Sequence, residues 1–65
     1  MNKLKKGDKT NINCKLNNKP YYYTGVKDFM TFDGLPCVFL ATDIKNKNTF
    51  ARFSQQYLNE HGYYI

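Results

Sequence analysis

An Asp-Gly pair between two apolar runs is the feature that most constrains the fold of this chain. Asp33–Gly34 separates PYYYTGVKDFMTF (residues 20–32) from LPCVFLATDI (residues 35–44), and both runs contain many β-branched and aromatic side chains. A two-residue Asp-Gly loop favours the type I′ turn, whose twist matches that of two antiparallel strands. The sequence therefore predicts a β-hairpin centred on Asp33–Gly34, with residues 35–44 buried on both faces for part of their length.

Period-two alternation predicts another strand before this hairpin. Over residues 9–16, Ile12, Cys14 and Leu16 fall on one side and polar residues fall on the other, which is typical of a half-buried strand. Two more strands are expected, over residues 49–53 and 62–65. Turns are expected at Gly7–Asp8, at Asn17–Asn18 and at residues 45–48.

Two local signals refine this outline. Residues 20–32 are long for one strand, and Gly25 near their middle predicts a bulge or bend. After Ser54 the alternation stops, and SQQYLNEHG contains good helix formers, with Ser54 placed to cap the first amides and Gly62 placed to end the turn. We therefore expect one or two turns of 3₁₀ or α-helix just before the last strand.

The length allows one small domain, residues 1–65, with a thin core. Five short strands in a chain of this size hide their edges best by curling into a small barrel, so we expect an all-β fold. No apolar run approaches the roughly 20 residues that span a bilayer, and no signal-peptide segment is visible. The expected location is the cytoplasm, without a membrane partner.

The segment LKKGD at residues 4–8, together with the helical turn before the last strand, resembles the SH3-like barrels, including KOW-type domains. The resemblance implies a five-stranded SH3-like barrel with one short 3₁₀ or α turn before the last strand. The resemblance identifies no binding residues in this chain, because the sequence does not contain the aromatic motifs that form the ligand groove of SH3 domains. The OB-fold and the Sm-like barrel remain alternatives, although the helix that each usually contains is not visible in this sequence.

Catalytic and metal-binding patterns are missing from the sequence. A zinc site needs four clustered ligands, whereas Cys14, Cys37 and His61 lie more than 20 residues apart and have no fourth partner. The glycines are isolated turn residues and form no phosphate-binding loop. We therefore expect no enzyme activity, no metal and no cofactor, and we expect both cysteines to be reduced thiols in the core.

The positive charge is concentrated near the start of the chain. The formal net charge is +5, but residues 1–27 carry seven lysines against one aspartate, while the remainder is close to neutral. Such asymmetry favours an anionic partner, and it also serves solubility. Codons of the abundant Lys, Asn, Tyr and Phe are A/T-rich, which suggests a phage or another mobile element and supplies a second explanation for the lysines.

The aromatic and basic residues of the first two strands are the candidate site. Three consecutive tyrosines cannot all face the core of a strand, so at least one is expected in solvent. Exposed rings interleaved with lysines are typical of proteins that bind single-stranded nucleic acid. The candidate residues are Lys15, Lys19, Tyr21, Tyr22, Tyr23 and Lys27.

A second hypothesis uses the same surface differently. Exposed Tyr and Phe side chains also anchor protein interfaces, so the chain could be an interaction module that inhibits or adapts a host protein. A thin core gains stability from dimerisation, which leaves a homodimer open as well. The structural alternative is that the tyrosines bridge core and solvent without any ligand.

Overall fold

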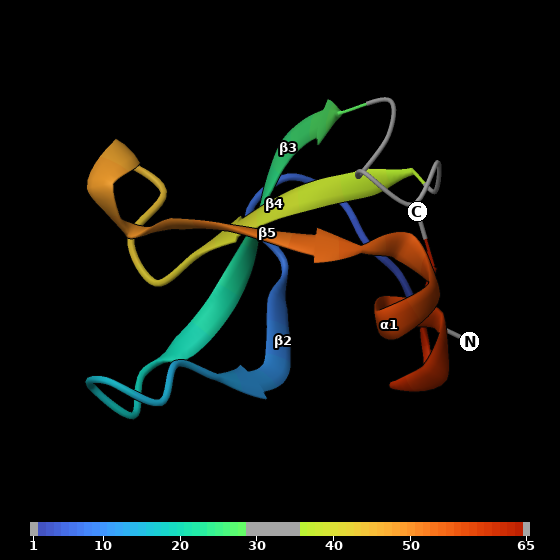
Figure 1. The fold of residues 1–65 in the computed structure, drawn as a ribbon, viewed down its shortest axis with the longest axis horizontal. Helices are drawn as coiled ribbons and strands as arrows, with labels where there is room; N and C mark the ends of the chain where they lie inside the picture. Colours follow the sequence, from blue (N-terminus) through green and yellow to red (C-terminus); the bar gives the residue numbers. More distant parts are fainter. Residues whose placement is uncertain (1, 29–35, 65) are drawn as a thin grey trace.

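The computed structural model describes residues 2–28 and 36–64. Four antiparallel strands form a curled sheet in the order β2–β3–β4–β5 (Figure 1). These strands are β2 (Lys9–Asn13), β3 (Pro20–Asp28), β4 (Cys37–Ala41) and β5 (Phe50–Ser54). A second sheet pairs β1 (Asn2–Lys3) in parallel with β6 (Tyr63–Tyr64). The expected small all-β fold is confirmed, although β1 was not expected.

The helical turn before the last strand is confirmed as α1 (Gln55–Glu60). Ser54 caps it as expected, because its side-chain oxygen accepts a hydrogen bond from the Tyr57 amide at 3.0 Å. Gly62 follows the helix with a φ of 86°, a conformation that suits glycine at a helix end. No helix among the residues that the structure describes is long and apolar enough to cross a membrane.

The turn of the first hairpin begins earlier than the alternation predicts, because strand β2 is shorter than expected. β2 ends at Asn13, since the Cys14 amide donates to the Lys19 carbonyl and the Asn18 amide donates to the Cys14 carbonyl, both at 2.8 Å. Asn18 adopts a left-handed conformation with a φ of 56°, which confirms the expected turn. The prediction that Leu16 lies on the buried side of a strand is wrong: Leu16 is in the turn and is 96% exposed.

Gly25 produces the expected irregularity in β3. The register with β4 shifts between Tyr23 and Lys27, and Gly25 has a φ of 81°. A Cβ atom at Gly25 would lie 3.2 Å from the Cβ of Lys6, so the neighbouring chain also leaves little room there. Glycine is therefore required at this bulge for both its conformation and its size.

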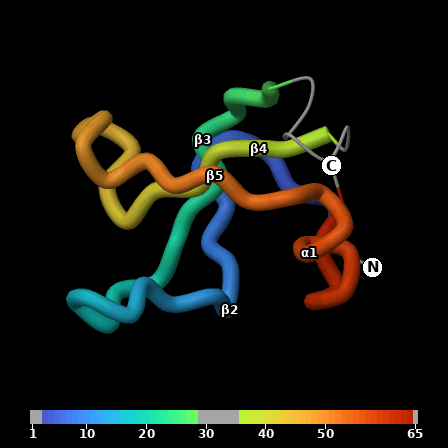
Figure 2. The backbone as a smooth tube through the Cα atoms, viewed as in Figure 1, coloured from blue at the N-terminus to red at the C-terminus, as the bar shows by residue number. Residues whose placement is uncertain are grey.

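The core lies between the inner face of the curled sheet and the segments beside the two chain ends. Leu40 and Leu58 are fully buried, one from β4 and the other from α1. The cluster comprises Leu4, Ile12, Tyr23, Val38, Leu40, Leu58 and Tyr63, with Tyr21 and Phe53 packed against it. Figure 2 shows both chain ends beside α1, and the helix covers that end of the curled sheet.

The second hairpin is only partly described. The Asp33–Gly34 turn and its flanking residues 29–35 lie outside the described residues. β3 and β4 do pair antiparallel, from Tyr22 opposite Ala41 to Asp28 opposite Cys37. β4 is largely buried on both faces, as expected. The next turn includes the 3₁₀ helix η1 (Lys47–Thr49), which leads into β5.

Candidate functional site

The three consecutive tyrosines have three different environments. Tyr23 is 4% exposed and belongs to the core, so its proposed role as a binding residue is not compatible with its position. Tyr21 is half-buried on the same inner face of β3, where it packs against Phe53. Tyr22 is half-buried on the opposite, outer face. The triplet therefore does not form one aromatic surface.

The three candidate lysines are all exposed but are not gathered at one place. Lys15 lies in the first hairpin turn, and Lys19 lies across that hairpin from Cys14. Lys27 is beyond the Gly25 bulge, near the other end of β3, where it pairs with Val38. Only Lys15 and Lys19 are therefore close to Tyr21, and Lys27 belongs to a different part of the surface.

A rung of side chains crosses the outer face of all four strands. Lys9 of β2 pairs with Tyr22 of β3, and Tyr22 pairs in turn with Ala41 of β4. Ala41 pairs with Phe50 of β5. Side chains of directly paired residues point to the same face of a sheet. Ala41 is small and fully buried, so the half-buried rings of Tyr22 and Phe50 flank it on the outer surface.

A second aromatic side chain and a guanidinium extend this outer face. Phe39 lies two residues before Ala41, and its ring centroid is 6.4 Å from that of Phe50. Arg52 pairs with Phe39 and holds its guanidinium carbon 5.4 Å from the ring centroid. Arg52 also forms an exposed ion pair with Asp28 at 3.2 Å. We call the set Lys9, Tyr22, Phe39, Phe50 and Arg52 the outer patch.

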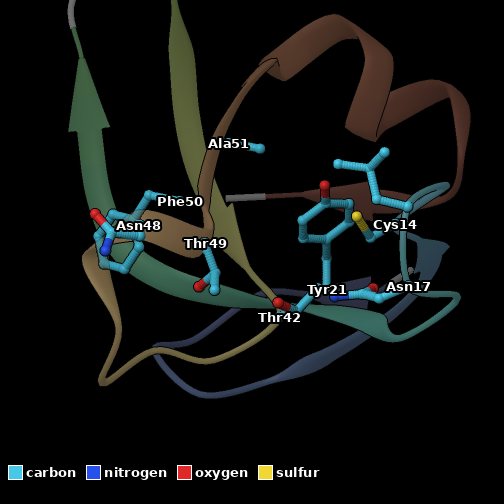
Figure 3. Close-up of a pocket in the computed structure, with 9 residues that line it drawn as sticks. Cys14, Asn17, Tyr21, Thr42, Asn48, Thr49, Phe50 and Ala51 are labelled. Atoms are coloured by element: carbon cyan, nitrogen blue, oxygen red, sulfur yellow. The ribbon is translucent and has the colours of Figure 1, made fainter.

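The inner face has a different character. Two adjoining hollows, of about 310 and 300 Å³, lie at the part of the sheet nearest the first hairpin and share Cys14, Leu16 and Tyr21. Figure 3 shows the Tyr21 ring and the Cys14 side chain side by side, with Ala51 nearby on β5 and Phe50 further away. We call the two hollows together the inner groove. Its apolar lining residues are Ile12, Leu16, Tyr21, Phe50, Ala51, Phe53 and Tyr57, and the hollow that contains Phe50 is also lined by Asn17, Thr42, Asn48 and Thr49.

Aromatic rings form a continuous row along this groove and onto α1. The rings of Tyr21 and Phe53 meet edge to face with centroids 5.2 Å apart, and Phe53 and Tyr57 follow at 5.6 Å. The His61 ring lies 4.2 Å from that of Tyr57 at the end of the helix. Tyr57 is 39% exposed, so the row reaches solvent at α1. Such pairs fix the ring positions without closing the groove.

Cys14 is a groove residue and not a core residue, contrary to expectation. It is partly exposed and carries a free thiol, whereas Cys37 is also free but fully buried. The Tyr21 hydroxyl and the backbone at Leu16 form hydrogen bonds that lower the pKa of the Cys14 thiol. The same interaction raises the pKa of Tyr21 to about 12, because a tyrosinate beside Cys14 would lose the hydrogen bond.

Several outer-patch residues were missed by the sequence reasoning. Phe39, Phe50 and Arg52 lie on β4 and β5, whereas the lysines and consecutive tyrosines that indicated a site lie on the first two expected strands. Alternation within residues 49–53 does place Phe50 and Arg52 on one face of the expected strand, so the sequence pattern could have indicated these two residues. Their alignment with Lys9 and Tyr22 depends on strand register, which the sequence did not define.

Comparisons with protein-family models, with curated proteins and with solved structures find no match to this chain. Across residues 2–28 and 36–64, no three His, Cys, Asp or Glu side chains are grouped so that they could hold a metal ion. The structure therefore offers two surfaces on which a function can rest. One is aromatic and basic, and the other is concave and apolar.

Proposed function

We propose that this protein is a non-enzymatic binding module that binds single-stranded nucleic acid on its outer patch. The observation that carries the proposal is the register that aligns Lys9, Tyr22 and Phe50 across the sheet. Single-strand binders combine a basic surface for the phosphates with aromatic side chains on which bases stack. Of the six residues predicted from the sequence, Tyr22 is retained at the centre of this surface.

The charge distribution supports an anionic ligand at this face. β2, which supplies Lys9, belongs to the segment 1–27 with seven lysines against one aspartate. Arg52 is at the other side of the patch, although Asp28 offsets part of its charge. Phosphate contacts are therefore expected mainly from lysines on the β2 side. Electrostatic contacts of this kind make binding sensitive to salt.

The aromatic side chains support stacking because the sheet holds them in place. Phe39 and Phe50 contact each other across neighbouring strands, and Arg52 lies over Phe39. Stacking on a positioned ring contributes about 1–3 kcal/mol for each base. A base is recognised through its π face here, so the proposal covers DNA and RNA without sequence specificity.

Two further inferences from the sequence accompany this proposal. The turn at residues 4–8 leads towards β2, and α1 immediately precedes β6, which supports the resemblance to SH3-like barrels at the level of element order. The abundance of Lys and Asn supports an origin in an A/T-rich genome such as that of a phage. The alternative role, as an interaction module for a host protein, rests on the inner groove.

Fluorescence anisotropy with labelled oligo(dT) and oligo(U) at several salt concentrations tests the proposal. Tyr22→Ala is expected to weaken binding roughly 5- to 150-fold, which corresponds to the loss of one stacked base. Lys9→Gln is expected to reduce the slope of log K against log salt by about 0.7, the value for one phosphate contact on a single strand. Comparing the two oligonucleotides distinguishes RNA from DNA.

Tyr64→Ala and Lys45→Gln are the matched controls. Tyr64 is an exposed tyrosine of β6, and Lys45 is an exposed lysine in the turn before η1, so neither belongs to the outer patch. Both variants should bind as the unmodified protein does. Absence of binding at low salt, or equal losses in Tyr22→Ala and Tyr64→Ala, would contradict the proposal.

A further inference from the structure

The inner groove is the second surface that lacks an assigned role. Its lining is mainly apolar, and Leu16 projects from the hairpin turn beside it with 96% of its surface exposed. The turn itself is well ordered by backbone hydrogen bonds from Cys14 to Lys19 and from Asn18 to Cys14. An exposed leucine on a hydrogen-bonded turn beside packed aromatic rings is typical of a protein interface.

The charge around the groove distinguishes a second copy of this chain from an acidic partner as the bound molecule. None of the described residues lining the two hollows carries a carboxylate, and Lys15 contributes a positive charge. Lys19 lies across the same hairpin from Cys14. A second copy of the chain would bring a net charge of +5 and another Lys15–Lys19 pair to the same place, which repulsion disfavours. The groove is complementary to an acidic partner.

The apolar lining decides which acidic partner it is. A nucleic-acid strand presents a continuous row of phosphates, whereas the groove offers a single lining lysine, and its other lining residues are uncharged. The two hollows instead suit two apolar side chains, because Tyr21 and Leu16 line both of them. Phe50 and Ala51 add apolar surface to one hollow, and Ile12, Phe53 and Tyr57 add it to the other. Buried apolar anchors surrounded by polar contacts are the usual basis of peptide recognition.

We propose that the inner groove binds an acidic peptide segment of a partner protein, with two apolar side chains of the segment in the two hollows. Carboxylates of the segment lie near Lys15 and Lys19 at the hairpin. Leu16 packs on the bound segment and covers its apolar side chains. The inner groove and the outer patch share Phe50, but Tyr21 and Tyr22 point to opposite faces of β3, so variants at Leu16 and at Tyr22 test the two surfaces separately.

The test selects displayed random peptides on the full-length chain and measures the strongest one by fluorescence anisotropy. The enriched peptides are expected to contain two apolar residues flanked by Asp or Glu. Leu16→Ser should weaken the binding of the selected peptide at least ~10-fold, the effect of losing an interface anchor. Val26→Ser is the matched control, because Val26 is an exposed aliphatic residue that lines neither hollow.

Charge reversal tests the second part of the proposal. Lys15→Glu should weaken binding of the acidic peptide most strongly at low salt, whereas Lys27→Glu, an exposed lysine near the far end of β3, should have a smaller effect. Failure to enrich acidic peptides, or unchanged binding in Leu16→Ser, would overturn the inference. So would a dimer of the unmodified protein that Leu16→Ser dissociates, since a second copy would then occupy the groove.

The two proposals fail separately. Leu16→Ser leaves the outer patch intact, so it should bind oligo(dT) like the unmodified protein. Tyr22→Ala leaves the hollows intact and should bind the selected peptide normally. A variant series in which Leu16→Ser abolished oligonucleotide binding and left peptide binding unchanged would refute the inference about the groove.

Discussion

Replacing Gly25 by alanine tests the conformation that shapes β3. Gly25 has a φ of 81°, in the region that L-residues avoid. Adopting this conformation costs an alanine about 1–2 kcal/mol. The smaller conformational freedom of alanine in the unfolded chain offsets about 0.4–1 kcal/mol of that cost.

The neighbouring chain adds a second cost at Gly25. The new Cβ would lie 3.2 Å from Cβ and 3.3 Å from Cγ of Lys6, closer than ordinary van der Waals contact. Lys6 must shift, so we expect Gly25→Ala to lower the free energy of unfolding by about 1–2 kcal/mol in total. In a domain of this size that change lowers Tm by roughly 7–15 °C.

Gly7→Ala separates the two contributions. Gly7 also has a positive φ, of 93°, but no heavy atom would lie within 4 Å of its Cβ. Urea unfolding followed by circular dichroism should therefore show a smaller loss for Gly7→Ala than for Gly25→Ala, with equal m values. An unchanged or higher midpoint for Gly25→Ala would refute the requirement for glycine at the bulge. Equal losses in both variants would show that contact with Lys6 costs nothing.

Two further predictions concern the core and the groove. Leu40→Ala removes a fully buried side chain and should cost about 2–5 kcal/mol in urea unfolding, whereas Leu16→Ala in the exposed turn should change stability by less than ~0.5 kcal/mol. The hydrogen bond between Tyr21 and Cys14 raises the pKa of Tyr21 from 10.0 to about 12 and lowers the pKa of the Cys14 thiol, so it is strongest when the thiol is ionised and the Tyr21 hydroxyl keeps its proton. Its stabilisation weakens as the pH falls and Cys14 takes up a proton, and it is lost as the pH rises through about 12. Tyrosinate absorbance should show this late ionisation, and Cys14→Ala should return it towards 10; an unchanged late titration in that variant would exclude Cys14 as the cause.

The features predicted well from the sequence are those set by local chemistry. The Ser54 cap, the left-handed Asn18 and the bulge at Gly25 depend on residues next to them in the chain. The side chains of Ser54 and Asn18, and the absence of a side chain at Gly25, favour the observed backbone conformation independently of distant contacts. Strand positions and the order of elements follow from these boundaries.

The site was predicted poorly because it depends on contacts between distant residues. Alternation correctly separates Tyr22 from Tyr21 and Tyr23, but it does not say which side faces the core. That choice is made by Leu4 and Leu58, which come from opposite ends of the chain. Leu16 was misplaced for a similar reason, since the cross-hairpin bond from Cys14 to Lys19 ends the strand before the apolar pattern does.

The parallel pairing of β1 with β6 has a consequence for the order in which the chain assembles. Asn2 pairs with Tyr63, and the Leu4 amide donates to the Tyr64 carbonyl, so these contacts close a loop that contains nearly the whole chain. Closing so long a loop carries a large entropic cost that local contacts cannot repay early. Leu4 therefore lacks its partner in β6 until residues 63–64 have been synthesised. Pairing of β1 with β6 is therefore expected to be a late step of folding, after the sheet and α1 have formed.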